Sequence, residues 1–112
     1  MRIGAAQIPV TTNVEDNLKN ILEACDWAVK NKLDYLLTPE CALSGYDTMT
    51  WNLNTCGPTE QAMEKLKEYS KNTGLGLAIG TLWIYDKDNQ STGFGNGITR
   101  NQLTFIQKGE II

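Results

Sequence analysis

One carboxylate, Glu40, stands directly after an apolar run that is typical of a buried strand. The run extends from Tyr35 to Leu37, and Pro39 keeps its preceding residue extended and has no N–H for a central ladder, so strand pairing is expected to end near Glu40. In open α/β sheets, catalytic and binding groups collect at the carboxyl ends of the strands. We therefore predict a functional site at Glu40, with the ring and hydroxyl of Tyr46 beside it after a turn at Gly45.

The other reactive side chains restrict the chemistry of this site. The chain has no histidine, and its three cysteines, Cys25, Cys41 and Cys56, lack the close spacing of a zinc motif. Ser-His and Cys-His nucleophile pairs are therefore excluded, and acid-base chemistry falls to carboxylates, lysines or tyrosines. We expect free thiols, no metal and no cofactor. On local sequence alone, Glu40 fits a structural carboxylate at a strand end as well as a catalytic one.

Cys41 follows Glu40 directly and is the one cysteine whose position suggests a nucleophile. Neighbouring residues on an extended segment point to opposite sides, and no cationic group that would activate the thiol is identifiable nearby. We therefore favour a structural role for Cys41 and for Cys56. Cys25 falls on the apolar stripe of a predicted helix, which makes it a core residue.

Composition indicates a folded protein and excludes two classes of partner. The 112 residues are 41% hydrophobic, enough for one domain or part of one, and we expect no internal domain boundary. A net charge of −3 with scattered basic residues argues against nucleic-acid binding. No apolar run approaches the roughly 20 residues that span a bilayer, and no signal peptide is evident, so we predict a cytoplasmic protein without a membrane partner.

The first third of the chain predicts a β-α-β unit with parallel strands. A strand buried on both faces is expected within residues 2–10, where Gln7 fits a hydrogen-bonded amide better than a ligand contact. Thr11 to Asn13 can cap a helix that ends near residue 31. The apolar stripe of that helix comprises Val14, Leu18, Ile21, Leu22, Cys25 and Val29.

The remaining residues predict a helix and further strands. Residues 47–56 lack a sustained period, and Trp51 there could contact substrate or cover the core. We then expect a helix over 59–72 that stops near Gly74. A strand over 75–85 follows it, and the glycines in this strand indicate close approach of neighbouring backbone. Two strands, 93–98 and 103–106, are expected around a turn near Arg100 and Asn101. The glycines at 93, 95 and 97 do not open a helix, which excludes a dinucleotide site. Residues 108–112 read as a turn into another apolar element.

The order of these segments resembles the nitrilase superfamily of carbon-nitrogen hydrolases. The resemblance rests on Pro39-Glu40-x-x-Leu43-Ser44-Gly45-Tyr46 after an apolar strand, on Ala5-x-Gln7 in the first strand, and on Asn17, Gly80 and Asn96 at matching places. It covers the whole chain but only the amino-terminal portion of the family's domain.

The resemblance implies an α/β fold that is part of a four-layer α-β-β-α sandwich, in an enzyme that assembles as a homo-oligomer. It also implies a Glu-Lys-Cys catalytic set acting on a small amide, nitrile or carbamoyl compound, in which Glu40 is the general base. The family lysine and cysteine come after the position of Ile112, and Lys108 lies too early to match. A chain with only the glutamate of this set is expected to be inactive by itself. Tyr46 is the candidate substrate-binding residue.

A second function, from a different class, stays open at this point. The chain could be a truncated, non-catalytic module that self-associates through an unfinished sheet or binds a partner protein. A module that binds a small molecule near Glu40 is a further alternative. The substrate itself cannot be inferred, because selectivity depends on loops around the missing nucleophile.

Overall fold

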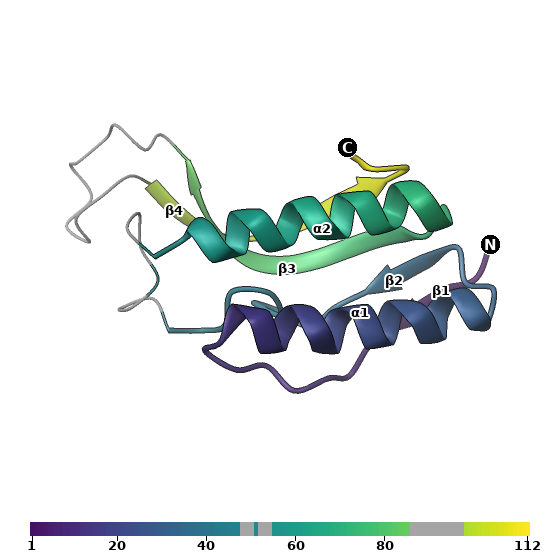
Figure 1. Cartoon of the computed structure of the whole chain (residues 1–112), viewed down its shortest axis with the longest axis horizontal. Helices are drawn as coiled ribbons and strands as arrows, with labels where there is room; N and C mark the ends of the chain where they lie inside the picture. The colour runs from purple at the N-terminus through teal and green to yellow at the C-terminus, as the bar shows by residue number, and fades with distance from the viewer. Residues whose placement is uncertain (48–50, 52–54, 86–97) are drawn as a thin grey trace.

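The computed structural model of the protein describes residues 1–47, 51, 55–85 and 98–112. In chain order, the elements of this part are β1 (Ile3–Ala5), α1 (Val14–Lys30), β2 (Tyr35–Leu37), α2 (Gly57–Thr73), β3 (Gly76–Tyr85), β4 (Ile98–Gln107) and β5 (Glu110–Ile111) (Figure 1). The strands form one sheet in the order β1-β2-β3-β4-β5. β1, β2 and β3 are parallel, whereas β4 and β5 add antiparallel strands. The predicted α/β class is confirmed, and the described residues form one layer of sheet and one of helices.

Helix α1 forms where its cap and apolar stripe predict it. The Asn13 side chain accepts a hydrogen bond from the backbone N–H of Asp16, and acidic residues in the first turn favour the positive end of the helix dipole. The residues of α1 that are buried are Asn17, Leu18, Ile21, Cys25 and Ala28. The stripe therefore ends on Ala28, while Val29 remains 40% exposed.

Helix α2 begins with Pro58 in its first turn and ends at a left-handed glycine. Gly74 has a φ of 78°, and its N–H donates to the carbonyl of Ser70, which satisfies one of the last carbonyls of the helix. This confirms the predicted stop at Gly74. Tyr69 of α2 donates from its hydroxyl to Asp26 of α1 at 2.6 Å, so the two helices are tied side by side.

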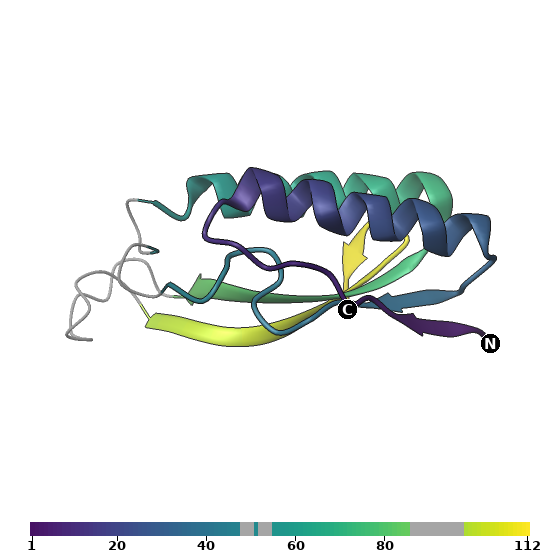
Figure 2. The ribbon, with the colours of Figure 1, turned by 90° about the horizontal axis from the view of Figure 1, so that it is seen from below.

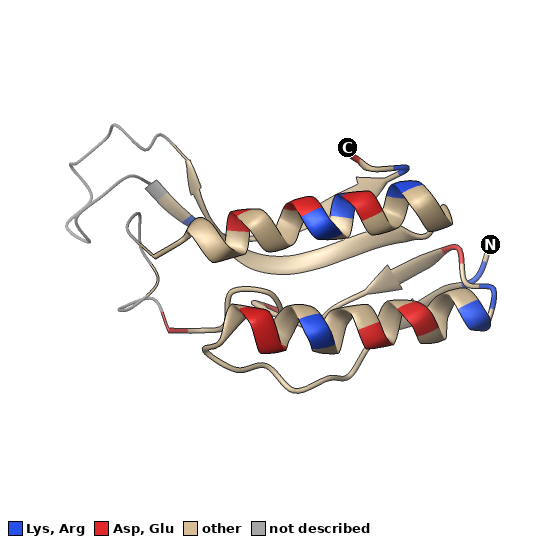
Figure 3. Ribbon diagram, viewed as in Figure 1, with Lys and Arg blue, Asp and Glu red and all other residues tan. Residues whose placement is uncertain are grey.

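Both helices lie on the same face of the sheet, and the main core lies between them and the strands (Figure 2). Leu36, Leu77, Ile79 and Ile106 project from the sheet into this core and are almost fully buried. Charged side chains gather on the two helices and in the loops, and none lies on β2 or β3 (Figure 3). Neither helix of the described chain is long and apolar enough to cross a membrane.

The opposite face of the sheet, called the open face below, has no helix over it among the described residues (Figure 2). The strand register places Ala5, Leu37, Ala78 and Phe105 in one row across this face. Leu37 and Phe105 are 39% and 46% exposed, although both are large apolar side chains. The open face is defined by this row together with Ile3 and Leu103.

Two expectations about the strands are wrong. β1 is a short strand at the edge of the described sheet, paired only with β2, so it is not buried on both faces, and Gln7 beyond it is exposed without a hydrogen bond to the described residues. β4 runs without a break through Arg100 and Asn101, where a turn was expected. Both residues can adopt an extended backbone, and they belong to nine consecutive residues of β4 that pair with β3. Residues 93–97, including Asn96, lie outside the described residues.

Candidate active site

The segment that carries Glu40, residues 38–45, leaves the end of β2 and crosses β3; it is called the crossing segment. Thr38 starts it with a buried hydroxyl, which donates to the carbonyl of Ala78 at 3.1 Å and accepts from the N–H of Gly80 at 2.9 Å. The Thr38 N–H also donates to Ala78 O at 2.9 Å. One threonine therefore fixes the point where the chain departs from the sheet, and regular pairing stops before Pro39 as predicted.

Gly80 of β3 is the residue that lets the crossing segment lie directly on the sheet. A Cβ built on Gly80 would stand 2.2 Å from the carbonyl oxygen of Pro39 and 3.0 Å from the Cα of Glu40. No side chain fits in that space, so glycine here permits the closest backbone approach. The Gly80 carbonyl also accepts from the N–H of Leu43 at 3.0 Å. The backbone of Glu40 is consequently held between two contacts with the same residue of β3.

The far end of the crossing segment is anchored by two buried polar side chains. Ser44 Oγ accepts from the N–H of Leu82 at 2.8 Å. The fully buried amide of Asn17 donates to the carbonyls of Leu43 and Thr11 at 3.1 and 2.8 Å, and its oxygen accepts from the Thr11 N–H at 2.8 Å. α1, the strand-to-helix loop and the crossing segment therefore meet at one amide. Buried amides need such partners, and this explains the asparagine in the first helix.

Glu40 is exposed and faces Asn101 of β4. Asn101 Nδ2 donates to Glu40 Oε1 at 2.6 Å, a short distance that is typical of a hydrogen bond to a charged group. The two side chains line an open depression of about 420 Å³ on the side of the sheet that carries the crossing segment. Its other lining residues are Leu37, Thr38, Gly80, Gln102 and Leu103. The carboxylate thus stands at the end of the open face, with one oxygen already oriented by the protein.

Cys41 adopts a left-handed backbone conformation with φ 51°, which is uncommon for a residue other than glycine. Its thiol is buried and approaches the amide oxygen of Asn101, with Sγ and Oδ1 3.5 Å apart. Burial and the neighbouring negative charge of Glu40 raise the pKa of Cys41, against a smaller opposing effect of the Ser44 hydroxyl. The thiol therefore keeps its proton at neutral pH, as a structural residue would.

Glu40 and Cys41 do not point to opposite sides as predicted, because the segment is not extended there. Residues 40 and 41 belong to a tight turn, in which Ala42 N–H donates to Pro39 O and Gly45 N–H donates to Cys41 O. Alternation applies to extended segments, and here both side chains reach the same asparagine from different ends of its amide.

The other predicted functional residues lie apart from the carboxylate. Tyr46 is 57% exposed and does not line the depression at Glu40, so its role in substrate binding stays a prediction. Trp51 is buried, and its indole N–H donates to the hydroxyl of Thr59 at 2.8 Å, which supports the interpretation as core cover. Cys25 is fully buried, and burial followed by the charge of Asp26 raises its pKa to about 12. That cysteine belongs to the core.

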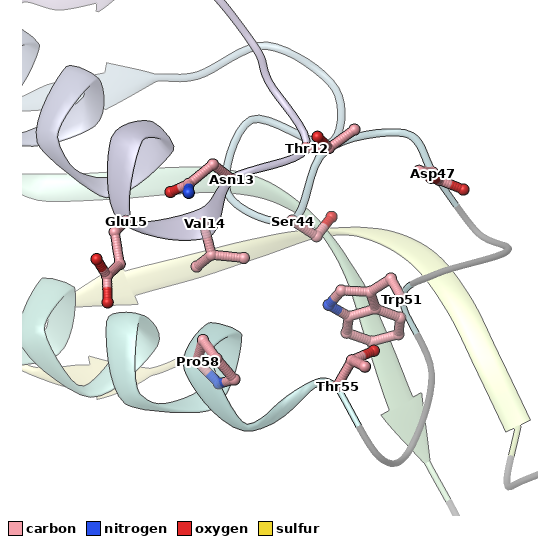
Figure 4. A pocket seen from close by; sticks show the side chains of 9 residues that line it. All are labelled: Thr12, Asn13, Val14, Glu15, Ser44, Asp47, Trp51, Thr55 and Pro58. Atoms are coloured by element: carbon pink, nitrogen blue, oxygen red, sulfur yellow. The ribbon is translucent and has the colours of Figure 1, made fainter.

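A second depression, of about 440 Å³, lies where the first turns of α1 and α2 come together (Figure 4). Glu15 and Pro58 border it from the two helices, and Ser44 and Trp51 from the loops. The hydroxyl of Ser44 and the indole N–H of Trp51 are already engaged with Leu82 and Thr59. Asp47 points away from the other labelled side chains in Figure 4. Two of the polar groups that line this depression are therefore already bonded within the protein.

Asn101 is the site residue that sequence reasoning missed. The sequence predicts a turn there because asparagine favours turns, but in the structure the segment is a continuous strand. The signal that could have found it is the hairpin at Lys108 and Gly109, with φ values of 51° and 85°, which fixes the end of β4. The pairing of Asn101 with Leu82 depends on the long-range register with β3, which no local pattern encodes.

Comparison with known proteins gives one consistent family. The family model described as "Carbon-nitrogen hydrolase" matches residues 2–112. "Nitrilase homolog 2" of Dictyostelium discoideum is 28% identical over 99% of this chain. A mutant of the Nesterenkonia AN1 amidase from the nitrilase superfamily has the same fold, with a TM-score of 0.76 at 19% identity over 100% of this chain. A glutamine-dependent NAD(+) synthetase from Cytophaga hutchinsonii matches over 99% of this chain, with a TM-score of 0.71 and 25% identity.

These proteins are much longer than the sequence described here. The chain covers 32% of the Dictyostelium protein, 40% of the amidase and 18% of the synthetase. The matching part is thus one region of a larger polypeptide in each case.

Proposed function

Because this chain belongs to the carbon-nitrogen hydrolase family, we propose that it supplies the general base of a hydrolase acting on a small, non-peptide amide, nitrile or carbamoyl compound. The base is Glu40. The observation that carries the proposal is the geometry of the crossing segment, which holds the backbone of Glu40 against Gly80 and directs its carboxylate to Asn101 at the mouth of an open depression.

Structures of a related amidase agree with this substrate class. One mutant of the Nesterenkonia amidase carries the acetamide moiety of fluoroacetamide, added covalently at its active-site cysteine, and another is in complex with butyramide. These are properties of the amidase, and they support a thiol nucleophile and a short amide substrate for the present family member.

The reaction then divides between this chain and the residues that the family places later. Glu40 removes the proton of the family cysteine, and the resulting thiolate attacks the carbon of the amide, nitrile or carbamoyl group. For an amide, the C–N bond breaks, the departing nitrogen takes up the proton, and a thioester remains. Water then attacks the thioester while Glu40 accepts its proton, the C–S bond breaks, and Glu40 returns the proton to the cysteine sulfur as the acid product leaves. The family lysine stabilises the negative charge that develops on the reacting oxygen or nitrogen.

The open face supports a four-layer α-β-β-α sandwich as the architecture of the whole domain. Its exposed apolar side chains, among them Leu37 and Phe105, are suited to packing against a second sheet in a four-layer α-β-β-α sandwich. We propose that the sheet and helices of this chain form one half of that sandwich, in a cytoplasmic homo-oligomer. Tyr46 is proposed to contact substrate from the turn after the crossing segment.

The test is Glu40→Gln in a polypeptide that contains these residues together with the family lysine and cysteine. Glutamine keeps the size of the side chain and can still accept from Asn101, but it cannot take a proton. We expect the rate of amide hydrolysis to fall by about 10²- to 10⁴-fold with folding intact. The matched control is Glu23→Gln on the exposed side of α1, which should leave the rate unchanged. Full activity of the Glu40 variant would refute the base.

The second candidate is a non-catalytic module, and the open face is the observation that favours it. A sheet with one apolar face exposed can pair with another copy or with another protein. Light scattering on the 112-residue chain tests the self-associating module, and a monodisperse monomer over a wide concentration range would count against it. A stable dimer of a polypeptide that also contains the family lysine and cysteine, without any hydrolase activity, would support it.

A further inference from the structure

Asn101 reaches Glu40 only because of where β4 lies in the sheet. The register pairs Leu103 with Gly80 and Asn101 with Leu82, so these residues of β4 share the side of the sheet on which the crossing segment lies. Glu40 comes from the end of β2, 61 residues away in sequence. The contact between the carboxylate and the amide therefore joins two strands that are not neighbours in the sheet.

Both ends of the Asn101 side chain are engaged. Nδ2 donates to Glu40 Oε1 at 2.6 Å, and Oδ1 accepts from Cys41 Sγ, which stands 3.5 Å away. A carboxylate requires a donor, and a protonated thiol requires an acceptor. The amide of Asn101 supplies a donor at one end and an acceptor at the other, so the two partners together fix which way this side chain is turned.

Asn101 therefore holds Oε1 of the Glu40 carboxylate and leaves Oε2 available for another interaction. Glutamate on an exposed turn has several rotamers of similar energy, and a charge-assisted hydrogen bond to a residue of the rigid sheet selects one of them. Among the described residues, nothing bonds to Oε2 of Glu40. That oxygen is left for proton transfer, on the same depression that Asn101 itself lines.

We propose that Asn101 is a positioning residue that holds the Glu40 carboxylate in the orientation needed for proton transfer, and that the Cys41 thiol aligns Asn101 for this task. The proposal rests on the proposed function for its catalytic meaning. It also assigns a role to Cys41, which is buried, has a left-handed backbone conformation and is unsuited to act as a nucleophile.

The first experiment tests the contact in the 112-residue chain by NMR. The side-chain amide signals of Asn101 should move in Glu40→Ala, because the variant removes the carboxylate to which the Asn101 amide donates. The same signals should stay in place in Glu23→Ala. Cys41→Ser, which keeps a donor, should preserve the Asn101 signals, and Cys41→Ala should broaden or displace them. An Asn101 amide that ignores Glu40→Ala would overturn the proposal, whatever the enzyme does.

The second experiment tests the role in a catalytically complete polypeptide. Asn101→Leu keeps the approximate volume and removes both polar groups, and we expect kcat to fall about 10- to 100-fold with KM nearly unchanged, as for the loss of one hydrogen bond to a charged group. The matched control is Gln107→Leu, which removes an amide at the far end of β4 beside Glu110. An Asn101→Leu variant with wild-type kcat refutes positioning while leaving Glu40 as base. Full activity of Glu40→Gln refutes the proposed function instead.

Discussion

The two faces of the sheet use the same strands but meet different surroundings. Alternate residues of β3 and β4 point to the helices, where Leu77, Ile79 and Ile106 are fully buried. The residues between them point to the open face, where Leu103 and Phe105 stay nearly half exposed. The helix-covered face therefore carries the main core, and a smaller buried cluster of Cys41, Trp51, Cys56, Leu82 and Ile84 is separate from it. The open face carries Glu40 and Asn101 at one end, so the candidate site lies on the side of the sheet that no described helix covers.

The largest effect is expected from a cavity on the helix-covered face. Leu66 of α2 is fully buried in the main core, and Leu66→Ala removes apolar contacts and leaves a cavity that the packed helices cannot close. We expect the free energy of unfolding to fall by about 2–5 kcal/mol, measured by urea denaturation. If the free energy of unfolding falls by less than about 1 kcal/mol, the core repacks around the cavity, and the two faces of the sheet then differ little in how tightly they are packed.

The next largest effect is expected at Gly80, where the crossing segment lies against the open face of β3. Gly80→Ala places a Cβ 2.2 Å from the Pro39 carbonyl oxygen, and that atom belongs to a backbone that cannot swing aside. We expect about 1–3 kcal/mol of destabilisation and displacement of Glu40, seen in the thermal midpoint and in the Asn101 side-chain signals. Gly57→Ala is the matched control, because its Cβ would meet nothing within 4 Å. Equal behaviour of the two variants would contradict the close approach at Gly80.

How much of this could be predicted from sequence differs between the two faces. The helix-covered face follows from local periodicity: the stripe of α1, the stop at Gly74 and the strand before Pro39 were all predictable, and the structure confirms them. The close approach of backbone at the β3 glycines was also predictable in kind. The partner of Glu40 was not, because Asn101 reaches it through the register between β3 and β4 and through a turn that places residues 40 and 41 on one amide. Local patterns specify elements, whereas this contact depends on how distant strands are aligned.

A pH-dependent effect is expected on the helix-covered face, where Cys25 is fully buried. Burial raises the pKa of Cys25 from 9.0 to about 12 in the folded chain, so the unfolded chain releases this proton first as the pH rises. The stability contributed by the neutral thiol is fully present below about pH 9 and is lost progressively toward pH 12, by at most about 1.4 kcal/mol per pH unit. We expect urea midpoints to decline in this range, and the decline to be shallower in Cys25→Ala. Parallel pH profiles for the two chains would show that this thiol does not contribute.

The smallest effect on stability, and the sharpest test of the open face, is expected from Phe105→Ser. Phe105 is 46% exposed, so replacing it removes only about half the buried apolar area of a core phenylalanine, and we expect a loss of about 1–2 kcal/mol. The same change removes the largest exposed ring from the row that includes Leu37, and self-association of the 112-residue chain should therefore require a higher concentration, as measured by light scattering. Ile111→Ser is the matched control, because Ile111 is also exposed but pairs with Ile106, whose side chain points to the helices. If Ile111→Ser weakens self-association and Phe105→Ser does not, the chain associates through its β5 edge. The open face is then not the surface through which copies of the chain associate.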